Sequence, residues 1–465
     1  MFWQGKEGDW IFSDGRKGMV IRVNEYIKVL LEQIRCRKAW SMVEGEMRNH
    51  ILDQAEANRL QGMEEKEALE EAVRDMGDPV EAGGALDRIH RPQMEWGMLV
   101  LIGAISLLSI FAQWMLGKAD ASLGQEYGIR HAAGVILGYL VMLAVYRVDY
   151  SYIGKYAKQI GAVFCAFVFL IVFGMGREIN GARVWISLGG WNISVIFLMY
   201  LFIPIYGALM YQYRGMGWKG LGKCFVWMLL PILAAWKIPC MSLTLALFLM
   251  MSIMLSIAVC RGWFSVCGKK LVAAYWILAA VLPVGLFLSV GMGHLPEYQQ
   301  ERIKAFLGME SSYVDYAGGL AAEYIKSSRL IGGSGREIVD WLPEFGSDYI
   351  LVFLAVYCGI AVAFSAGLLI LAIAAKTIRI AFGQKNQLGM MMGCGCGLVF
   401  EMMPLMGILR IFGLIPATQT FFPFLSGSQA GVIVSYILAG IILSIYRYRN
   451  ILPREKPVFR QQLYK

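Results

Sequence analysis

Long apolar runs separated by short polar connections make up most of the chain after residue 95. A helix needs about 20 mostly apolar residues to cross the hydrocarbon core of a bilayer, and ten runs approach or reach that length. The fifth run is the weakest candidate because it is short and contains Pro231, so it would have to tilt little or thin the bilayer. The predicted spans are residues 97–116, 131–146, 159–175, 192–211, 224–236, 241–260, 271–292, 349–375, 388–409 and 429–446.

This pattern predicts an all-α, polytopic membrane protein with about ten transmembrane helices. Composition agrees, because 57% of the 465 residues are hydrophobic, only 17% are charged and the mean hydropathy is +0.54. Such values are too apolar for a soluble fold of this length.

Lysine and arginine alternate between the two sides of the predicted spans. The second, fourth, sixth and eighth connections carry three cations each, whereas the short connections between them carry one or two. Because cytoplasmic loops are enriched in these residues, we expect both termini in the cytoplasm. The predicted domains are a prefix at 1–95, a membrane domain at 96–450 with a long external loop at 293–347, and a basic tail at 451–465.

The formal net charge of +9 is explained by this inner-face bias and by attraction to anionic membrane lipids. No basic stripe with interleaved aromatic residues is present, so we expect no nucleic-acid partner. The nine cysteines and four histidines are scattered, and no spacing among them predicts a metal site.

The first 95 residues show a helical period instead of long apolar runs. Gly62 is expected to end one helix, and Gly77 to end another before Asp78 and Pro79 start the next as N-cap and first helical residue. We predict a small soluble helical bundle without a signal peptide, because residues 1–20 lack a suitable apolar core. Its role is either docking and regulation or simply folding and insertion. Apolar residues recur at helical spacing at Ile27, Leu30, Leu31 and Ile34.

Three segments carry a family resemblance. They are "GREINGARVWISLGGW" at 176–191, "LPEFGSDYILVF" at 342–353 and "GLIPATQTFFPFLSGS" at 413–428. The first is similar to a Gly-Ala, Arg-Trp-Ile, Leu-Gly motif, the second to Leu-Pro-Glu-x-x-x-Asp-Phe-Ile, and the third to Gly-Leu-x-Pro-x-Thr followed by Pro-Phe-x-Ser. Together they resemble the FtsW, RodA and SpoVE (SEDS) family over roughly residues 97–450.

The chain also departs from the family pattern. Polar family residues are replaced at Ser194–Phe197 and at Ala355–Tyr357, Pro239 is followed by Cys240 instead of aspartate, and Arg183 stands one place before the family position. We therefore expect a divergent member, in which either an active polymerase or a silent paralogue that scaffolds or regulates the wall machinery is possible.

The resemblance implies polymerisation of lipid II, a polyprenyl-diphosphate-linked disaccharide peptide, at the outer membrane face in cell shape, division or sporulation. On this basis Asp348 is the candidate general base, and Arg183, Trp185, Glu344 and Ser426 are candidate substrate-binding residues. The resemblance also implies a location in the bacterial plasma membrane and a class B penicillin-binding protein as partner. The sequence identifies no certain cofactor, although a divalent cation (Mg²⁺ or Mn²⁺) bound by Asp348 and the diphosphate could share the diphosphate charge. A lipid II flippase is the third functional class.

Other interpretations of these residues stay open at the sequence level. Asp348 could cap the eighth helix, Trp185 could anchor the membrane interface, Arg183 could hold a lipid phosphate, and Glu344 could be an ordinary loop charge. Glu401 is the only acid well inside a predicted span and should face a cavity or a partner such as Arg410. Small residues such as Gly359 and Gly367 could allow close contact with a partner helix.

Overall fold

The computed structural model describes residues 14–450 except 125, 180–181, 189–190, 239, 267, 292–296, 298–299, 302–303, 305–315, 337–344 and 416–418. The chain divides into two compact units. One unit contains Met1–Gln93 together with Tyr448–Lys465, and the other contains Met94–Arg447. We call them the prefix unit and the membrane unit.

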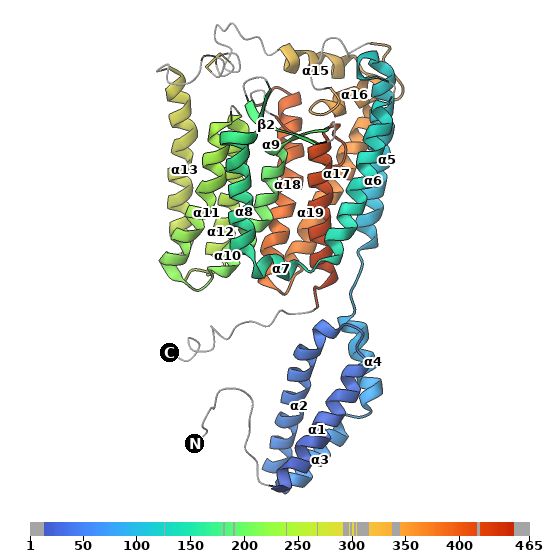
Figure 1. The fold of residues 1–465 in the computed structure, drawn as a ribbon, viewed down its shortest axis with the longest axis vertical. Helices are drawn as coiled ribbons and strands as arrows, with labels where there is room; N and C mark the ends of the chain where they lie inside the picture. The colour runs from blue at the N-terminus through green and yellow to red at the C-terminus, as the bar shows by residue number, and fades with distance from the viewer. Residues whose placement is uncertain are drawn as a thin grey trace. The chain divides into compact units, whose positions relative to one another are not determined.

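The prefix unit is a helical bundle (Figure 1). Asp78 caps its fourth helix by accepting a hydrogen bond from the Val80 amide at 3.1 Å, and Pro79 is the first helical residue, as predicted. Gly62 and Gly77 both adopt positive φ between helices, a conformation that favours glycine. The helices are α1 (Asp14–Glu32), η1 (Arg37–Ala39), α2 (Trp40–Leu60), α3 (Glu65–Asp75) and α4 (Pro79–His90).

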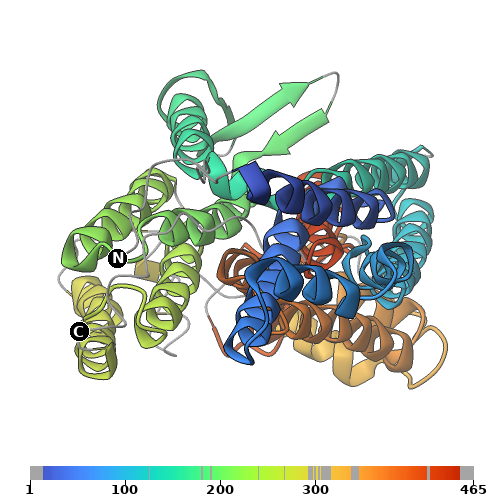
Figure 2. The same ribbon diagram turned by 90° about the horizontal axis from the view of Figure 1, so that it is seen from below.

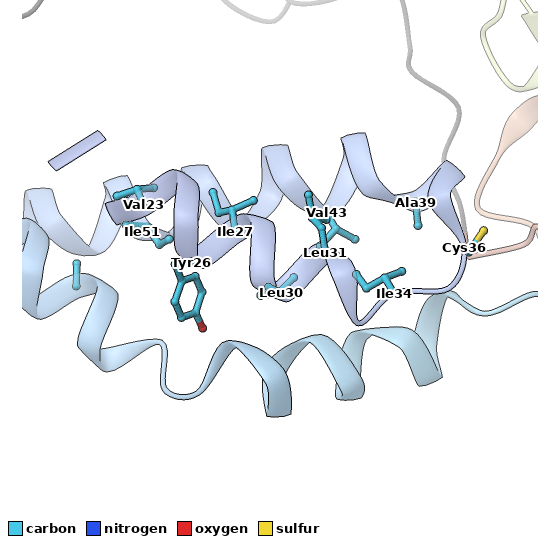
Figure 3. Packing of buried hydrophobic residues seen from close by; sticks show 11 residues of the cluster. Val23, Tyr26, Ile27, Leu30, Leu31, Ile34, Cys36, Ala39, Val43 and Ile51 are labelled. Atoms are coloured by element: carbon cyan, nitrogen blue, oxygen red, sulfur yellow. The ribbon is translucent and has the colours of Figure 1, made fainter. Parts of the chain in front are cut away.

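The core of the prefix unit forms between α1, α2 and the helices that pack against them (Figure 3). Ile27, Leu30, Leu31 and Ile34 are all buried, so the predicted apolar stripe is the face that packs. Burying each such side chain contributes about 1.5–3 kcal/mol, so this stripe contributes substantially to the stability of the bundle.

The start of the C-terminal tail belongs to this same unit. Tyr448 packs against the prefix core, the Lys38 ammonium lies 4.6 Å from the centre of its ring, and the Asn450 side-chain amide donates to the Ile89 carbonyl at 2.7 Å. Burial lowers the pKa of Lys38, while Cys36 acts in the opposite direction. Tyr448 and Asn450 are therefore part of the same compact unit as the prefix helices.

The membrane unit is built from long apolar helices (Figure 1). Among the described residues, nine helices are long and apolar enough to cross a membrane. A further helix, α13, has 24 residues and is long enough at about 1.5 Å per residue. The nine are α5 (Trp96–Ala119), α6 (Tyr127–Arg147), α8 with η3 (Ala157–Met175), α9 to α10 (Val195–Gln212), α11 (Gly217–Lys237), α12 (Met241–Cys260), α17 (Ile360–Phe382), α18 (Gln387–Ile411) and α19 (Gln429–Arg447), and α13 is Gly268–Gly291.

These helices correct one detail of the predicted spans. The fifth, α11, has 21 residues and contains Pro231, so it is a full-length crossing and not the short one expected. The structure extends it back to Gly217, because the lysines in its first turns still allow helix formation even though they interrupt the apolar run.

The helices α10, α18 and α19 form the interior of the membrane unit. Helix α10 packs against α18, α19 packs against α6, and α17 packs against α18; the views in Figures 1 and 2 show the same arrangement. The short elements η2 (Ala121–Leu123), α7 (Tyr150–Lys155), α15 (Tyr316–Ser327) and α16 (Ile350–Tyr357) lie in connections.

The third connection is not helical. It folds as an antiparallel three-stranded sheet in the order β1 (Arg177–Ile179), β2 (Ala182–Leu188) and β3 (Trp191–Ser194), seen beside the helices in Figure 2. Apart from this sheet, the described residues of the membrane unit are all-α. Side chains alternate between faces along a strand, which explains why this motif shows no helical period.

The predicted eighth span, residues 349–375, is broken. Helix α16 ends at Tyr357 and the spanning helix α17 begins only at Ile360. Between them Gly359 has φ +107°, and a Cβ there would lie 2.8 Å from the Leu330 carbonyl oxygen. The preceding loop holds this break through a hydrogen bond from the Ile360 amide to the Arg329 carbonyl at 3.0 Å. Gly359 therefore packs closely against the backbone of this earlier loop.

Candidate functional site

Asp348 lies two residues before α16 and is buried. Its carboxylate forms an ion pair with Arg410, which lies in the last turn of α18. The two side chains are only 6% and 11% exposed, respectively, and the Arg410 guanidinium also lies 4.6 Å from the centre of the Tyr349 ring. A guanidinium next to a carboxylate favours the ionised form of the acid, which is the form that can accept a proton.

The helix-cap interpretation of Asp348 is not supported by this geometry. Helix α16 has Tyr349 as its N-cap and has no side-chain cap hydrogen bond. Asp348 is therefore held by Arg410, and its side chain is buried inside the protein.

The expected pairing of Glu401 with Arg410 is wrong. Nine residues separate them on α18, which at about 100° per residue places them about half a turn apart, on opposite faces of the helix. Glu401 is exposed, whereas Arg410 turns inward to Asp348.

Ser426 belongs to the segment that precedes α19, and this segment contacts the loop of Asp348. The Gly427 amide donates to the Gly346 carbonyl at 2.8 Å. The Ser426 hydroxyl is fully buried and accepts a hydrogen bond from the Ser428 amide at 3.4 Å. Ser426 thus shapes the turn beside Asp348, and like Asp348 it is buried.

Arg183 and Trp185 lie on strand β2. Arg183 is exposed and pairs with Glu178 of β1, with 2.8 Å between Nε and the carboxylate, while Trp185 is half-buried. Val184 between them is buried. Because side chains alternate along a strand, the shift of the arginine by one place relative to the family moves it to the face opposite Val184, the same face as Trp185.

The predicted site residues are thus only partly brought together. The segments of Asp348 and Ser426 touch, whereas within the described part of the chain no hydrogen bond or ion pair joins Arg183 or Trp185 to Asp348. Glu344 lies outside the described residues.

A divalent cation would find few protein ligands at this site. No group of three or more His, Cys, Asp and Glu side chains that could hold a metal ion occurs in the described ranges, and Asp348 is already beside a guanidinium. Hard divalent cations take about six or more oxygen ligands, so an ion here would depend mainly on oxygen atoms of the substrate.

The sequence pattern does not reveal two residues that hold this region. Arg410 pairs directly with Asp348, and Gln113, a buried amide in α5, bonds to the Gly346 carbonyl in the loop before Asp348. A polar residue inside an apolar span is a signal that could have identified Gln113.

Comparisons with known proteins extend over the whole membrane unit. The FtsW/RodA/SpoVE family, described as cell cycle protein, matches residues 92–451. Stage V sporulation protein E of Bacillus subtilis is 25% identical over 369 residues, covering 76% of this chain and 94% of that protein. A probable peptidoglycan glycosyltransferase FtsW of Trichlorobacter lovleyi is 25% identical over 375 residues, covering 76% and 93%.

Solved structures show the same fold. One, described as "Structural coordination of polymerization and crosslinking by a peptidoglycan synthase complex", matches with a TM-score of 0.61 and 18% identity, covering 77% of this chain and 98% of that one. The rod shape determining protein RodA of Thermus thermophilus matches with a TM-score of 0.53 and 19% identity, covering 77% and 97%.

Proposed function

Because the chain belongs to the FtsW/RodA/SpoVE family of cell cycle proteins, we propose that it acts in bacterial cell-wall synthesis as a peptidoglycan glycosyltransferase. Its substrate is lipid II, and the reaction takes place at the outer membrane face. The observation that carries the proposal is the buried ion pair of Asp348 and Arg410, because it supplies an ionised carboxylate in a place from which most water is excluded.

Asp348 acts as the general base. A sugar hydroxyl of one lipid II molecule attacks the anomeric carbon of another, the bond from that carbon to the diphosphate oxygen breaks, and the hydroxyl proton moves to the Asp348 carboxylate. Exclusion of water strengthens electrostatic interactions in such a site, and proton transfer to a positioned base contributes about 10²–10⁴-fold to the rate. Arg410 stabilises the charged form of the base before the reaction.

Arg183 binds the departing diphosphate and stabilises its negative charge. Its guanidinium is exposed, and its partner Glu178 is also half exposed, so the pair is weak and the arginine can turn to a phosphate. A guanidinium binds phosphate oxygens through two parallel hydrogen bonds. Trp185 shares the same strand face and offers an apolar surface to the sugar or lipid portion of the substrate.

The partner proposed is a class B penicillin-binding protein with a single transmembrane helix. The fold match to a chain from a peptidoglycan synthase complex supports this pairing. The protein crosses the membrane several times, and the proposed orientation places both termini in the cytoplasm; the contact of Tyr448 with the prefix core supports a common side for the two ends.

A silent paralogue that scaffolds the wall machinery is the second candidate. It is favoured by Ile196 and Phe197, which are buried apolar residues where the family carries a serine and a glutamate. The prefix unit then supplies the docking function, and Asp348 with Arg410 is a structural pair only.

The test is polymerisation of purified lipid II by the detergent-solubilised protein, with and without a class B penicillin-binding protein. The parent should form glycan strands, and Asp348→Asn should lower the rate about 10²-fold or more. Asp120→Asn is the matched control, because Asp120 is another buried acid whose carboxylate accepts hydrogen bonds from Ser122 and which lies outside this site.

Equal rates for the parent and Asp348→Asn would exclude Asp348 as the base. A parent that binds the partner but makes no glycan with any partner tested would establish the scaffold role instead.

A further inference from the structure

Gln113 is a fully buried amide inside the spanning helix α5. Its Nε2 donates to the Gly346 carbonyl at 2.8 Å and to the Leu425 carbonyl at 3.3 Å, and its Oε1 accepts from the Tyr127 hydroxyl at 3.0 Å. A polar side chain buried in an apolar helix is unfavourable unless it is fully hydrogen-bonded. Both the nitrogen and the oxygen of this amide are hydrogen-bonded. We call this set of three hydrogen bonds the junction.

This junction joins two segments that are far apart in the sequence. Gly346 stands two residues before Asp348, and Leu425 stands just before the turn into α19. The same Gly346 carbonyl also accepts from the Gly427 amide at 2.8 Å. Gln113 therefore ties the loop of Asp348 both to α5 and to the segment before α19.

One helical turn earlier on α5, Ser109 makes a similar contact with the segment before α19 but does not bond to Gly346. Its hydroxyl donates to the Leu425 carbonyl at 3.3 Å and is 2.9 Å from His131 Nε2. Ser109 is also fully buried. The helix thus presents two buried polar groups to the segment before α19, and only Gln113 of this pair reaches Gly346 as well.

We propose that Gln113 is a positioning residue that fixes the loop of Asp348 so that the carboxylate meets the acceptor hydroxyl. The inference rests on the proposed glycosyltransferase function. Helix α16 begins only after Asp348, so the carboxylate stands on a loop and takes its position from the Arg410 pair and from the backbone at Gly346. A displacement of about 1 Å at a reacting group can lower a rate by about 10²-fold.

The test compares Gln113→Met, which keeps the length and volume of the side chain but removes all three hydrogen bonds, with Ser109→Ala as the matched control. Hydrogen exchange of residues 345–349 and of the Gly427 amide is measured in the full-length protein without substrate. Polymerisation of lipid II is then measured to separate kcat from KM.

Gln113→Met should raise exchange at residues 345–349 and at Gly427 by about 10-fold or more, because local opening exposes these amides. It should also lower kcat by about 10²-fold with KM changed less than about threefold, as expected when only the transition state is affected. Ser109→Ala should keep the parent's hydrogen-exchange rates at residues 345–349 and the parent's kcat.

Unchanged exchange at residues 345–349 in Gln113→Met would overturn the proposal, whatever the activity. Raised exchange with an unchanged kcat would overturn it as well. If the parent itself makes no glycan, the proposed glycosyltransferase function is wrong, and so is the proposal that Gln113 positions Asp348 for that reaction. The exchange data still show whether Gln113 holds the loop. Should Gln113→Met accumulate poorly, Gln113→Asn, whose amide is one carbon shorter, must show the same pattern to a smaller extent.

Discussion

Arg410 pairs with Asp348 across 62 positions of the sequence, and both side chains are almost fully buried. The arginine comes from the last turn of α18 and the aspartate from the loop before α16. Removing one member of a buried pair leaves an uncompensated charge, which is more damaging than removing both. This relationship separates the structural role of Asp348 from its proposed chemical role.

We expect Asp348→Asn and Arg410→Gln each to destabilise the protein by about 3–5 kcal/mol. The double variant should be less destabilised than the sum of the two, because it removes both charges and retains polar side chains that can bond to each other. Thermal unfolding in detergent of the parent, both single variants and the double variant measures the coupling. Additive losses would show that the two residues are not coupled.

The double variant should also remain inactive in lipid II polymerisation. Its amides restore packing but neither can take a proton. Recovery of both stability and activity in the double variant would show that Asp348 matters only as the partner of Arg410. The measurement is the initial rate at saturating lipid II, with Asp120→Asn again as the control.

Gly359→Ala should destabilise the break between α16 and α17. The residue has φ +107°, and its new Cβ would lie 2.8 Å from the Leu330 carbonyl oxygen, so strain and a steric clash combine to about 1–3 kcal/mol or more. Gly367→Ala is the matched control, because the methyl group added there would meet no described atom beyond its own helical turn within 4 Å. Thermal unfolding of the two variants compares their stabilities. An equal loss of stability in both would contradict the structural role of Gly359.

Arg183→Ala should leave stability nearly unchanged. The pair with Glu178 is about half exposed on both sides, and such pairs contribute about 0–1 kcal/mol. We expect the KM for lipid II to rise several-fold and kcat to fall far less than in Asp348→Asn. Glu178→Gln removes the partner of the arginine and should not raise the KM for lipid II. Steady-state kinetics of both variants measure these effects. If Arg183→Ala had the same KM as the parent, the proposed phosphate role of Arg183 would be contradicted.

Two truncations test the contact between the tail and the prefix core. A chain ending after Asn450 keeps Tyr448 and the bond to Ile89, whereas a chain ending after Arg447 loses both. We expect only the shorter chain to show faster hydrogen exchange in α1 and α2, because part of the apolar core becomes exposed. The same exchange in both truncations would mean that the tail does not stabilise the prefix unit.

Local sequence pattern was sufficient to locate the apolar crossings and the prefix helices, but it missed the start of the fifth crossing and the break in the eighth. Apolar length reports a membrane span directly, because each span must bury about 20 residues in lipid, and the cap at Asp78 depends only on its neighbours in the chain. The family match followed from short motifs. These properties are local, so they can be derived from residues that lie within one or two helical turns of each other.

The tertiary structure alone decided what surrounds Asp348. The partner Arg410, the amide of Gln113 and the turn at Gly427 come from three separate segments, and no local period connects them. The same is true of the break at Gly359, which is stabilised by the backbone of an earlier loop, and of Tyr448 on the prefix core. Contacts of this kind depend on how the helices pack, because packing brings together residues whose sequence separation carries no information about their distance.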